Sequence, residues 1–580
     1  MKKPRFKKLI SRLLFLVIGL ICFLLASRAV ESLQATMNRH VYAQRTLNSS
    51  SNIPATNYYV SPSGDDANAG TSPAKAWRTL SQVNRFSFRP GDRILLEGGQ
   101  SFDGGLRFDS DDVGIPVRPI TVSSYGQGRA IIAAGNGYGI YIHNTMGFDI
   151  SNLTIVGSGR TTNTGSGVFL NNDLAGDIKL KLVRIDQVEV SGFGNYGILI
   201  DGNKGKSGYR DVRITNAVAH DNALAGIYVQ GEFSQSSTAY AHEDIYIGYS
   251  RAYKNSGVSG TSRQHSGSGI LISDVDGGIV ERSVVYENGW LCNSNQGGPV
   301  GIWAWDSNNI TLQYNESYRN RTDSKWDGGG LDLDGGVTNS VMQYNYSHDN
   351  DGSGYLLAQF PYARKFTGNT VRYNISQNDG RKNSYGAIYL FGEIHNSEVY
   401  NNTIYLTPPA NGSPLAVNIH KDSTTNVHFR NNIFQTTSGL RLIEIASGQT
   451  DLLFQGNDYF SSSAELQIRW LGKNYNTLKA WRSATGQERV KAEDVGLSVD
   501  PKLLVPGKGD TFNNAKLLDT LSSYRLQNSS PLIEAGLNLR QLFALDPGTR
   551  DYYGNRLPQG AAFDVGAHEF EAKLSRSNQH

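Results

Sequence analysis

Residues 197–200 read Gly-Ile-Leu-Ile, and this pattern of a glycine followed by apolar, variable and apolar residues recurs along the chain. Its copies begin at Gly139, Gly167, Gly197, Gly226, Gly269, Gly301, Gly330, Gly354 and Gly386, between 24 and 43 residues apart. Such spacing is regular, but looser than that of helical repeats, and the alternation indicates strands with one buried face. We therefore expect stacked coils joined by loops of variable length. The buried positions are predicted to include Ile140, Ile198, Ile227, Ile270, Ile302 and Leu331.

A second pattern, a tyrosine close before an asparagine, falls between the glycine copies. Its clearest copies begin at Tyr314, Tyr344, Tyr373 and Tyr400, 27 to 30 residues apart. Asparagine tolerates the left-handed backbone of a sharp turn, and its amide can bond to the next coil. The asparagines are therefore predicted to turn the chain and to form a ladder along the stack.

The composition agrees with an all-β chain. The 580 residues include 64 glycines and 30 tyrosines, and only 18% are charged, which suits many short strands and tight turns. The formal charge is +3, but residues 1–45 hold nine Lys or Arg and one Glu, which leaves 46 positive and 51 negative charges, or −5, elsewhere. This balance argues against a nucleic-acid partner.

The N-terminus has the form of an export signal. Six basic residues precede the apolar run 13–26, and Ser27-Arg28-Ala29 offers a cleavage site. Residues 1–29 are predicted to be a signal peptide or, if they are not cleaved, an anchor that is the only membrane contact. We expect an exported protein, in the periplasm, at the cell surface or secreted. Residues 30–56 are predicted to be a polar linker.

Blocks at both ends of the mature chain carry a family resemblance. Residues 58–73 read Tyr-Tyr-Val-Ser-Pro-Ser-Gly-Asp-Asp-Ala-Asn-Ala-Gly-Thr-Ser-Pro, and the closing blocks 551–558 and 564–569 read Asp-Tyr-Tyr-Gly-Asn-Arg-Leu-Pro and Asp-Val-Gly-Ala-His-Glu. With the repeated coils between them, these blocks resemble the pectin lyase-like superfamily. The resemblance implies a single-stranded right-handed parallel β-helix. The superfamily contains polysaccharide lyases, hydrolases, epimerases and phage adhesins, so the fold leaves the reaction open.

Both ends of such a solenoid need caps, because open coils would expose the core and unpaired strand edges. We expect an N-terminal helix and strand cap with the first coils at 57–125, and the main β-helix at 126–460. An irregular C-terminal cap region is predicted at 461–570, with a disordered tail at 571–580. The protein is expected to be a monomer.

Candidate site residues follow from superposing the coils on their glycines. The second and fourth residues after each glycine then point outward, which places Trp303 and Trp305 beside Asp332 and Asp334 of the next coil. Exposed tryptophans bind sugar rings, and neighbouring carboxylates can act as acid and base. Their spacing along a strand, about 7 Å, lies near the lower limit of the roughly 6.5–9.5 Å typical of inverting glycosidases. An exposed active centre that cleaves polysaccharide is therefore predicted.

The stretch 326–336, Trp-Asp-Gly-Gly-Gly-Leu-Asp-Leu-Asp-Gly-Gly, loosely resembles the acid-bearing strand of β-helical glycoside hydrolases of the polygalacturonase type. The resemblance implies Asp332 and Asp334 as acid and base, with Asp327 as a further candidate. The Gly-His-Gly and Arg-x-Lys motifs of that family are absent at the expected places. His265, four residues before Gly269, is a candidate for substrate binding.

Three alternatives to a cofactor-free hydrolase stay open. A lyase or epimerase acting on uronic-acid polymers would bind Ca²⁺ through carboxylates that include Asp327 and Asp351, and would use Arg364 or Lys365 to bind substrate and remove its proton. A non-catalytic adhesin would need only the aromatic face. In a purely structural interpretation, Asp327 and Asp351 cap turns, the Asp332 pair holds an ion and the tryptophans lie under a loop.

Overall fold

The computed structural model describes residues 54–260, 265–421, 424–462 and 465–571. The predicted signal or anchor, nearly all of the linker and the tail after residue 571 lie outside these ranges. Export and the fate of residues 1–29 therefore stay predictions. Within the described ranges, no helix is both long and apolar enough to cross a membrane.

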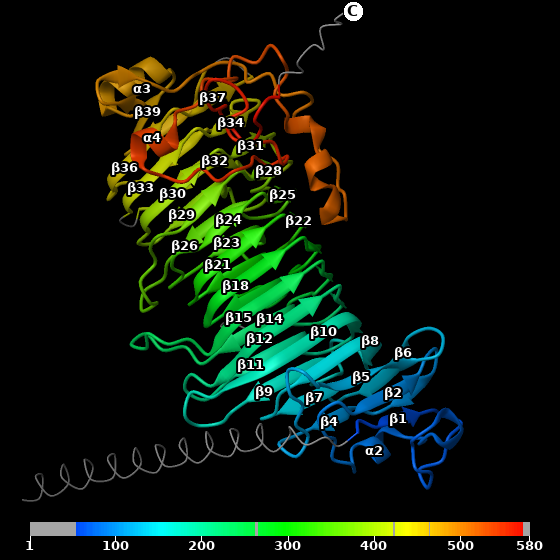
Figure 1. Cartoon of the computed structure of the whole chain (residues 1–580). Helices are drawn as coiled ribbons and strands as arrows, with labels where there is room; N and C mark the ends of the chain where they lie inside the picture. Colours follow the sequence, from blue (N-terminus) through cyan, green and yellow to red (C-terminus); the bar gives the residue numbers. More distant parts are fainter. Residues whose placement is uncertain (1–53, 261–264, 422–423, 463–464, 572–580) are drawn as a thin grey trace, which may run out of the picture.

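The chain winds into one elongated parallel β-helix, as predicted (Figure 1). One sheet has 25 strands, from β1 (Asn57–Val60) and β2 (Arg93–Glu97) at one end to β37 (Asp458–Ser461) at the other. The other sheet has 14 strands, and all its pairings are parallel except the last. In chain order its strands are β4 (Leu106–Phe108), β7 (Ile140–His143), β9 (Val168–Asn172), β11 (Tyr196–Gly202), β14 (Ala225–Gly231), β17 (Ser268–Ser273), β20 (Val300–Trp305), β23 (Gly329–Leu333), β26 (Tyr355–Ala358), β29 (Gly386–Phe391), β32 (Leu415–Ile419), β35 (Ile443–Ile445), β38 (Ile468–Trp470) and β39 (Lys473–Tyr475).

The predicted interior residues are buried. Ile140, Ile198, Ile227, Ile270, Ile302 and Leu331 all have 0% exposed surface. The glycines recur because neighbouring coils approach closely at this column: a Cβ built on Gly197 would lie 2.6 Å from the carbonyl oxygen of Gly226, and one on Gly226 would lie 2.8 Å from that of Gly269. A side chain at these positions would therefore force neighbouring coils apart.

The predicted asparagine ladder is present in the 25-stranded sheet. The amide of Asn315 donates to the Oδ1 of Asn345 at 3.0 Å, and the same contact continues through Asn374, Asn402, Asn432 and Asn457. The left-handed backbone, however, belongs to the residue before each ladder asparagine, with φ of 53° at Tyr314 and 58° at Tyr344. The division is physical, since the asparagine side chain turns inward to bond while its neighbour makes the bend.

Caps close both ends of the stack. At the N-terminal end, Trp77 and the short helix α2 (Leu80–Val83) cover the first coil. At the other end, Trp481 of α3 (Leu478–Thr485) is fully buried against Phe454 and Trp470. The parallel coils extend to β38, which pairs with β35 and ends at Trp470, ten residues beyond the predicted end of the β-helix at residue 460.

The C-terminal residues do more than cover the last coil, which the sequence did not indicate. Residues 497–567 return along the outside of the 25-stranded sheet and include α4 (Leu539–Phe543) (Figure 1). They pack on outward tyrosines such as Tyr346 and Tyr373. The backbone N–H of Phe512 donates to the buried Glu316 at 2.7 Å, which ties this strap to the middle of the stack.

Candidate active site

Strands β20 and β23 bring the predicted tryptophans and aspartates together. Trp303 and Asp332 are partners in register. Leu331 and Leu333 are fully buried in the core, so Asp332 between them points outward. Asp334 follows β23 directly, and its N–H donates to the carbonyl oxygen of Ala304 at 2.8 Å. The predicted two-by-two arrangement is therefore present.

The prediction that this pair is exposed is wrong for Asp332. Its exposed fraction is 2%, and that of Trp303 is 5%, whereas Trp305 and Asp334 are half-buried. The indole N–H of Trp303 donates to the Oγ of Ser268 at 3.0 Å. Loop residues 295–297 and 360–362 surround the cleft at this point, so residues that point away from the core are still shielded from solvent.

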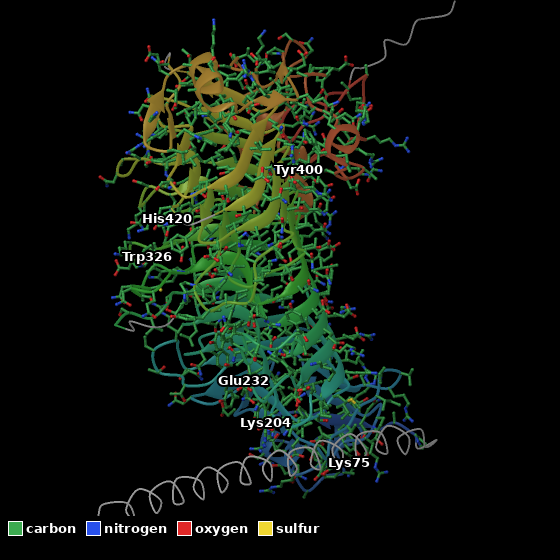
Figure 2. All side chains as sticks on the ribbon, turned by 90° about the vertical axis from the view of Figure 1, so that its left-hand side faces the viewer. Lys75, Lys204, Glu232, Trp326, Tyr400 and His420 are labelled. Atoms are coloured by element: carbon green, nitrogen blue, oxygen red, sulfur yellow. The ribbon has the colours of Figure 1, made fainter. Side chains whose placement is uncertain are left out.

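Two hollows meet at the acids. The central cleft, about 640 Å³, is lined by His265, Asn295, Gln296, Gly297, Trp326, Asp327, Asp332, Asp334, Leu356, Ala358, Gln359, Phe360, Pro361, Tyr362, Tyr385, Tyr389 and Phe391. The aromatic hollow, about 300 Å³, lies over earlier coils and includes Tyr196, Tyr228, Leu271, Trp303 and Trp305. Both are lined by His265, Asp334 and Phe360, so Asp334 stands at their junction. Trp326, which lines the central cleft, is labelled in Figure 2 and shows where the cleft lies along the solenoid.

Asp327 is held in the central cleft by two donors. Its Oδ2 accepts from the N–H of Gly298 at 2.6 Å, and its Oδ1 accepts from the hydroxyl of Tyr385 at 3.3 Å. The same hydroxyl accepts from the N–H of Asp327 at 2.9 Å. Tyr385 lies directly before β29, so a residue two coils away orients this carboxylate.

Burial raises the pKa of all three cleft aspartates. The pKa of Asp334 rises to about 6. Burial, followed by the charges of Asp334 and Asp327, holds the pKa of Asp332 well above its usual range. The Oδ1 of Asp332 has no hydrogen-bond partner among the described residues, which fits a carboxylic acid that keeps its proton. Burial also raises the pKa of Asp327, against the opposing hydrogen bond from Gly298 and the charge of His265. All three carboxyl groups of the cleft therefore keep their protons to a higher pH than an exposed aspartate does.

His265 lies at the site, as predicted. Its ring is 5.8 Å from that of Trp303, and its Nδ1 is 3.4 Å from the carbonyl oxygen of Gly298. Gly298 also donates to Asp327, so His265 is close to the loop that holds this carboxylate.

Arg364 and Lys365 do not face the acids, which corrects the predicted substrate-binding role. The Arg364 guanidinium is paired with Asp274 at 2.9 Å and with Asp306, and it lies 4.2 Å from the ring centre of Tyr240. Lys365 is exposed and contributes to neither hollow. Their loop turns Phe360, not its basic residues, toward the cleft.

The predicted calcium set is not assembled. Asp351 pairs with Arg321 at 3.1 Å and accepts from the N–H of Thr322 at 3.1 Å, which is the turn-capping role of the structural interpretation. Asp327 instead faces the cleft. In the part of the chain that the structure describes, no three carboxylate, histidine or cysteine side chains are grouped as metal ligands.

Tyr389 and Phe391 line the cleft and were missed because of a one-residue slip. The register pairs Leu356 with Tyr389, so Ala387, not Gly386, occupies the glycine position of that coil. Counted from Ala387, Tyr389 and Phe391 are the second and fourth residues and point outward. A one-residue shift exchanges the two faces of a strand. The apolar alternation from Ile388 to Leu390 was the signal that could have corrected it.

Comparison with known proteins agrees with the fold. A family model described as "Right handed beta helix region" matches residues 241–404. The predicted right-handed parallel β-helix is therefore confirmed. A lacto-N-biosidase from Bifidobacterium longum subsp. longum is 26% identical over 491 residues, which are 67% of this chain and 29% of that protein. The chain thus spans less than a third of that relative's length.

Solved structures of similar fold include two carbohydrate-active proteins. A GH136 lacto-N-biosidase from Eubacterium ramulus is 17% identical with a TM-score of 0.46, over 72% of this chain and 68% of that one. The pectate lyase Pel9A is 17% identical with a TM-score of 0.40, over 89% of this chain and 97% of that one.

Proposed function

We propose that the chain is a glycoside hydrolase that cleaves a neutral glycan at the junction of the central cleft and the aromatic hollow. One observation carries the proposal. Asp334, whose pKa is raised to about 6, stands between two hollows lined by aromatic side chains, with Asp327 in the same cleft. Sugar rings bound in the two hollows would place the linking oxygen beside Asp334.

The three carboxyl groups suit different tasks. Asp334 can hold a proton near neutral pH and give it to the glycosidic oxygen. Burial raises the pKa of Asp327, but the two hydrogen bonds that it accepts oppose this shift and favour its ionised form, so we assign it the task of activating water or attacking the sugar. Asp332 is almost inaccessible, and we assign it a protonated, supporting role beside the other two.

The charge of the site favours a neutral substrate over a uronic acid. Of the described residues that line the two hollows, none is Lys or Arg. A uronate would lie beside carboxylates with no cation to offset its charge, and elimination also needs the negative charge on that group to be neutralised. Hydrolysis is therefore favoured over a lyase or epimerase reaction. The name of the 26% identical relative, lacto-N-biosidase, supports this choice and suggests the first substrate to assay.

The test is an activity screen of the purified full chain on a chromogenic lacto-N-bioside, other neutral glycans and uronic-acid polymers. New reducing ends should appear with neutral glycans. Asp334→Asn should lower kcat by roughly 100- to 10,000-fold, the usual contribution of an acid–base group. Asp323→Asn, a change at an exposed carboxylate outside both hollows, is the matched control.

Two results would contradict the proposal. Products with a new conjugated double bond from a uronic polymer would identify a lyase. Binding of glycans with no product from the wild-type chain would instead identify the adhesin alternative.

A further inference from the structure

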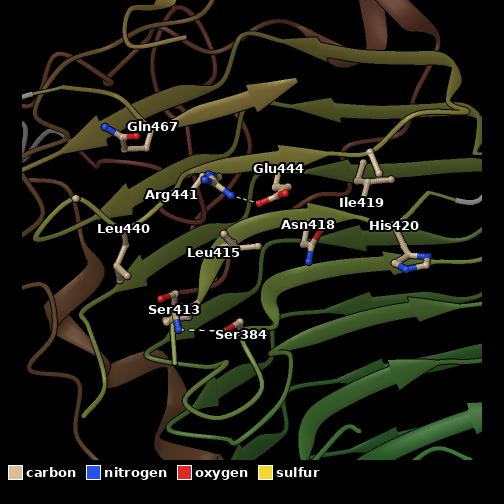
Figure 3. A pocket seen from close by; sticks show the side chains of 13 residues that line it. Ser384, Ser413, Leu415, Asn418, Ile419, His420, Leu440, Arg441, Glu444 and Gln467 are labelled. Carbon is tan, nitrogen blue, oxygen red and sulfur yellow. Dashed lines mark hydrogen bonds and ion pairs between the residues drawn. The ribbon is translucent and has the colours of Figure 1, made fainter. Parts of the chain in front are cut away.

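A third hollow continues along the 14-stranded sheet beyond the central cleft. This distal groove, about 540 Å³, is lined by β32, β35 and neighbouring loop residues, with Asn418, His420, Arg441, Glu444 and Gln467 among them (Figure 3). Figure 2 marks His420 on the same side of the molecule as Trp326. The groove and the cleft therefore share one face of the solenoid.

The row of outward residues leads from the acids into the distal groove without a break. Asp332 pairs in register with Leu356, and Leu356 with Tyr389. Tyr389 then pairs with Asn418, and Asn418 with Glu444. Four coil steps of about 4.8 Å separate β23 from β35, a distance of about 19 Å. Such a length accommodates several consecutive sugar rings.

The two sites are also in contact at their border. The ring of Phe391, which lines the cleft, lies 4.9 Å from that of His420, which lines the groove. Tyr389 stands beside Phe391 on the same strand, at 6.3 Å between ring centres. An aromatic platform therefore bridges the cleft and the groove.

The groove has the chemistry of a site for uncharged, hydroxyl-rich ligands. Asn418 and Gln467 offer both donors and acceptors. Arg441 forms an ion pair with Glu444 (Figure 3). The other carboxylate oxygen of Glu444 is 3.4 Å from the guanidinium of Arg469. The groove's cation is thus already paired with a carboxylate, and planar polar groups beside an apolar platform are a typical lining for ligand sites.

We propose that the distal groove is a carbohydrate subsite, which binds the part of the same neutral glycan that extends beyond the bond cut at Asp334. This inference rests on the proposed hydrolase and names its substrate class more closely. The substrate is an oligosaccharide or polysaccharide that lies parallel to the solenoid axis. A short glycoside fills only the central cleft and the aromatic hollow.

The test compares short and long substrates. The double variant Asn418→Ala/Glu444→Ala should lower kcat/KM on a long neutral glycan by about tenfold, mainly through KM, as expected for the loss of one or two hydrogen bonds. On a short chromogenic glycoside its kcat/KM should stay equal to that of the wild type. Gln467→Ala, an independent change in the same groove, should act in the same direction and protects the test if the double variant fails to fold.

The matched control lies in a similar hollow on the other sheet. That hollow, about 480 Å³, crosses β15 (His242–Gly248) and β21 (Asn308–Gln313) and contains Glu243 and Thr311. Like Glu444, Glu243 is paired with an arginine, Arg210. Glu243→Ala/Thr311→Ala should leave kcat/KM unchanged on both the short and the long substrate, because this hollow lies on the other sheet and is not continuous with the acids.

The outcomes separate the two proposals. Equal losses on short and long substrates, or no loss on either, would overturn the subsite while the hydrolase stands. If the wild type yields no product, calorimetric binding of the long glycan still decides the subsite. If the Asn418→Ala/Glu444→Ala variant binds the long glycan more weakly than the wild type while the control variant does not, the subsite is supported even though the hydrolase proposal fails. Unchanged binding by the Asn418→Ala/Glu444→Ala variant would overturn the subsite.

Discussion

The Tyr385 hydroxyl contacts Asp327 twice, since it accepts from the backbone N–H at 2.9 Å and donates to the Oδ1 at 3.3 Å. Removal of this hydroxyl in Tyr385→Phe takes away a hydrogen bond that lowers the pKa of Asp327, so that pKa should rise. We expect kcat/KM to fall by about tenfold at neutral pH, with the acidic limb of its pH profile moved upward. Tyr389→Phe, which removes a tyrosine hydroxyl four residues further along the chain, in β29, is the matched control. An unshifted acidic limb would show that Asp327 does not have to ionise.

The raised pKa of Asp334 predicts how activity depends on pH. As general acid, Asp334 must be protonated, so kcat/KM should fall as the pH rises through about 6. Asp327 must be ionised, so kcat/KM should also fall at low pH. Initial rates at low substrate concentration across the pH range measure this profile. Activity that continues to increase above neutral pH would exclude Asp334 as the acid.

Asp332 should make the protein less stable as the pH rises. Its pKa is raised in the folded state, so its favourable contribution is complete below the unfolded value of about 4 and is lost as the pH rises through the folded value. Asp332→Asn mimics the protonated acid and should raise the free energy of unfolding at neutral pH, by about 1.4 kcal/mol for each unit of pKa shift. Urea unfolding at several pH values measures the difference. The wild type and the variant should converge in acid, and parallel curves would contradict a buried, protonated Asp332.

Trp305 should bind substrate through its ring. It is half-buried in the aromatic hollow, 5.8 Å from Phe233 and 6.4 Å from Phe360 between ring centres. Trp305→Ala should raise KM roughly tenfold with a small change in kcat, since an aromatic contact contributes about 1 kcal/mol beyond its buried area. Trp290→Ala, outside both hollows and beneath Arg160, should leave KM unchanged. A loss in kcat alone would point to misplacement of Asp334 instead.

The asparagine ladder should contribute to stability without affecting chemistry. The Asn374 amide donates to Met342 and Asn402, and its Oδ1 accepts from Asn345. Asn374→Ala leaves these buried groups without partners and should lower the free energy of unfolding by about 3 kcal/mol. Chemical unfolding measures the change, while kcat/KM of the folded variant should match the wild type. A change below about 0.5 kcal/mol would show that the ladder relaxes around the gap.

The fold was predictable because its signal is local and repeated. Most coils show the same glycine followed by alternating apolar residues, so the burial predicted for Ile198 is supported separately by the same pattern at Leu331, and both side chains are fully buried. The position of Trp303 beside Asp332 in the site could be predicted from the same repeat, because it fixes the register between neighbouring coils. The loops that cover Asp332 have no period, and their paths depend on tertiary contacts such as the Arg364 ion pairs. Exposure of the acids and the role of Tyr385 were therefore out of reach.

The strap formed by residues 497–567 places a condition on biosynthesis. A solenoid can add coils in the order in which the ribosome makes them, since each coil mainly contacts its neighbours. The tyrosines on its flank, including Tyr346 and Tyr373, are covered by the part of the chain that is translated last. A nascent chain in which all coils and the active-site aspartates have been made thus still exposes an apolar, aromatic surface on this flank. Premature termination before residue 497 would yield a molecule with a complete cleft and a surface that chaperones and proteases recognise.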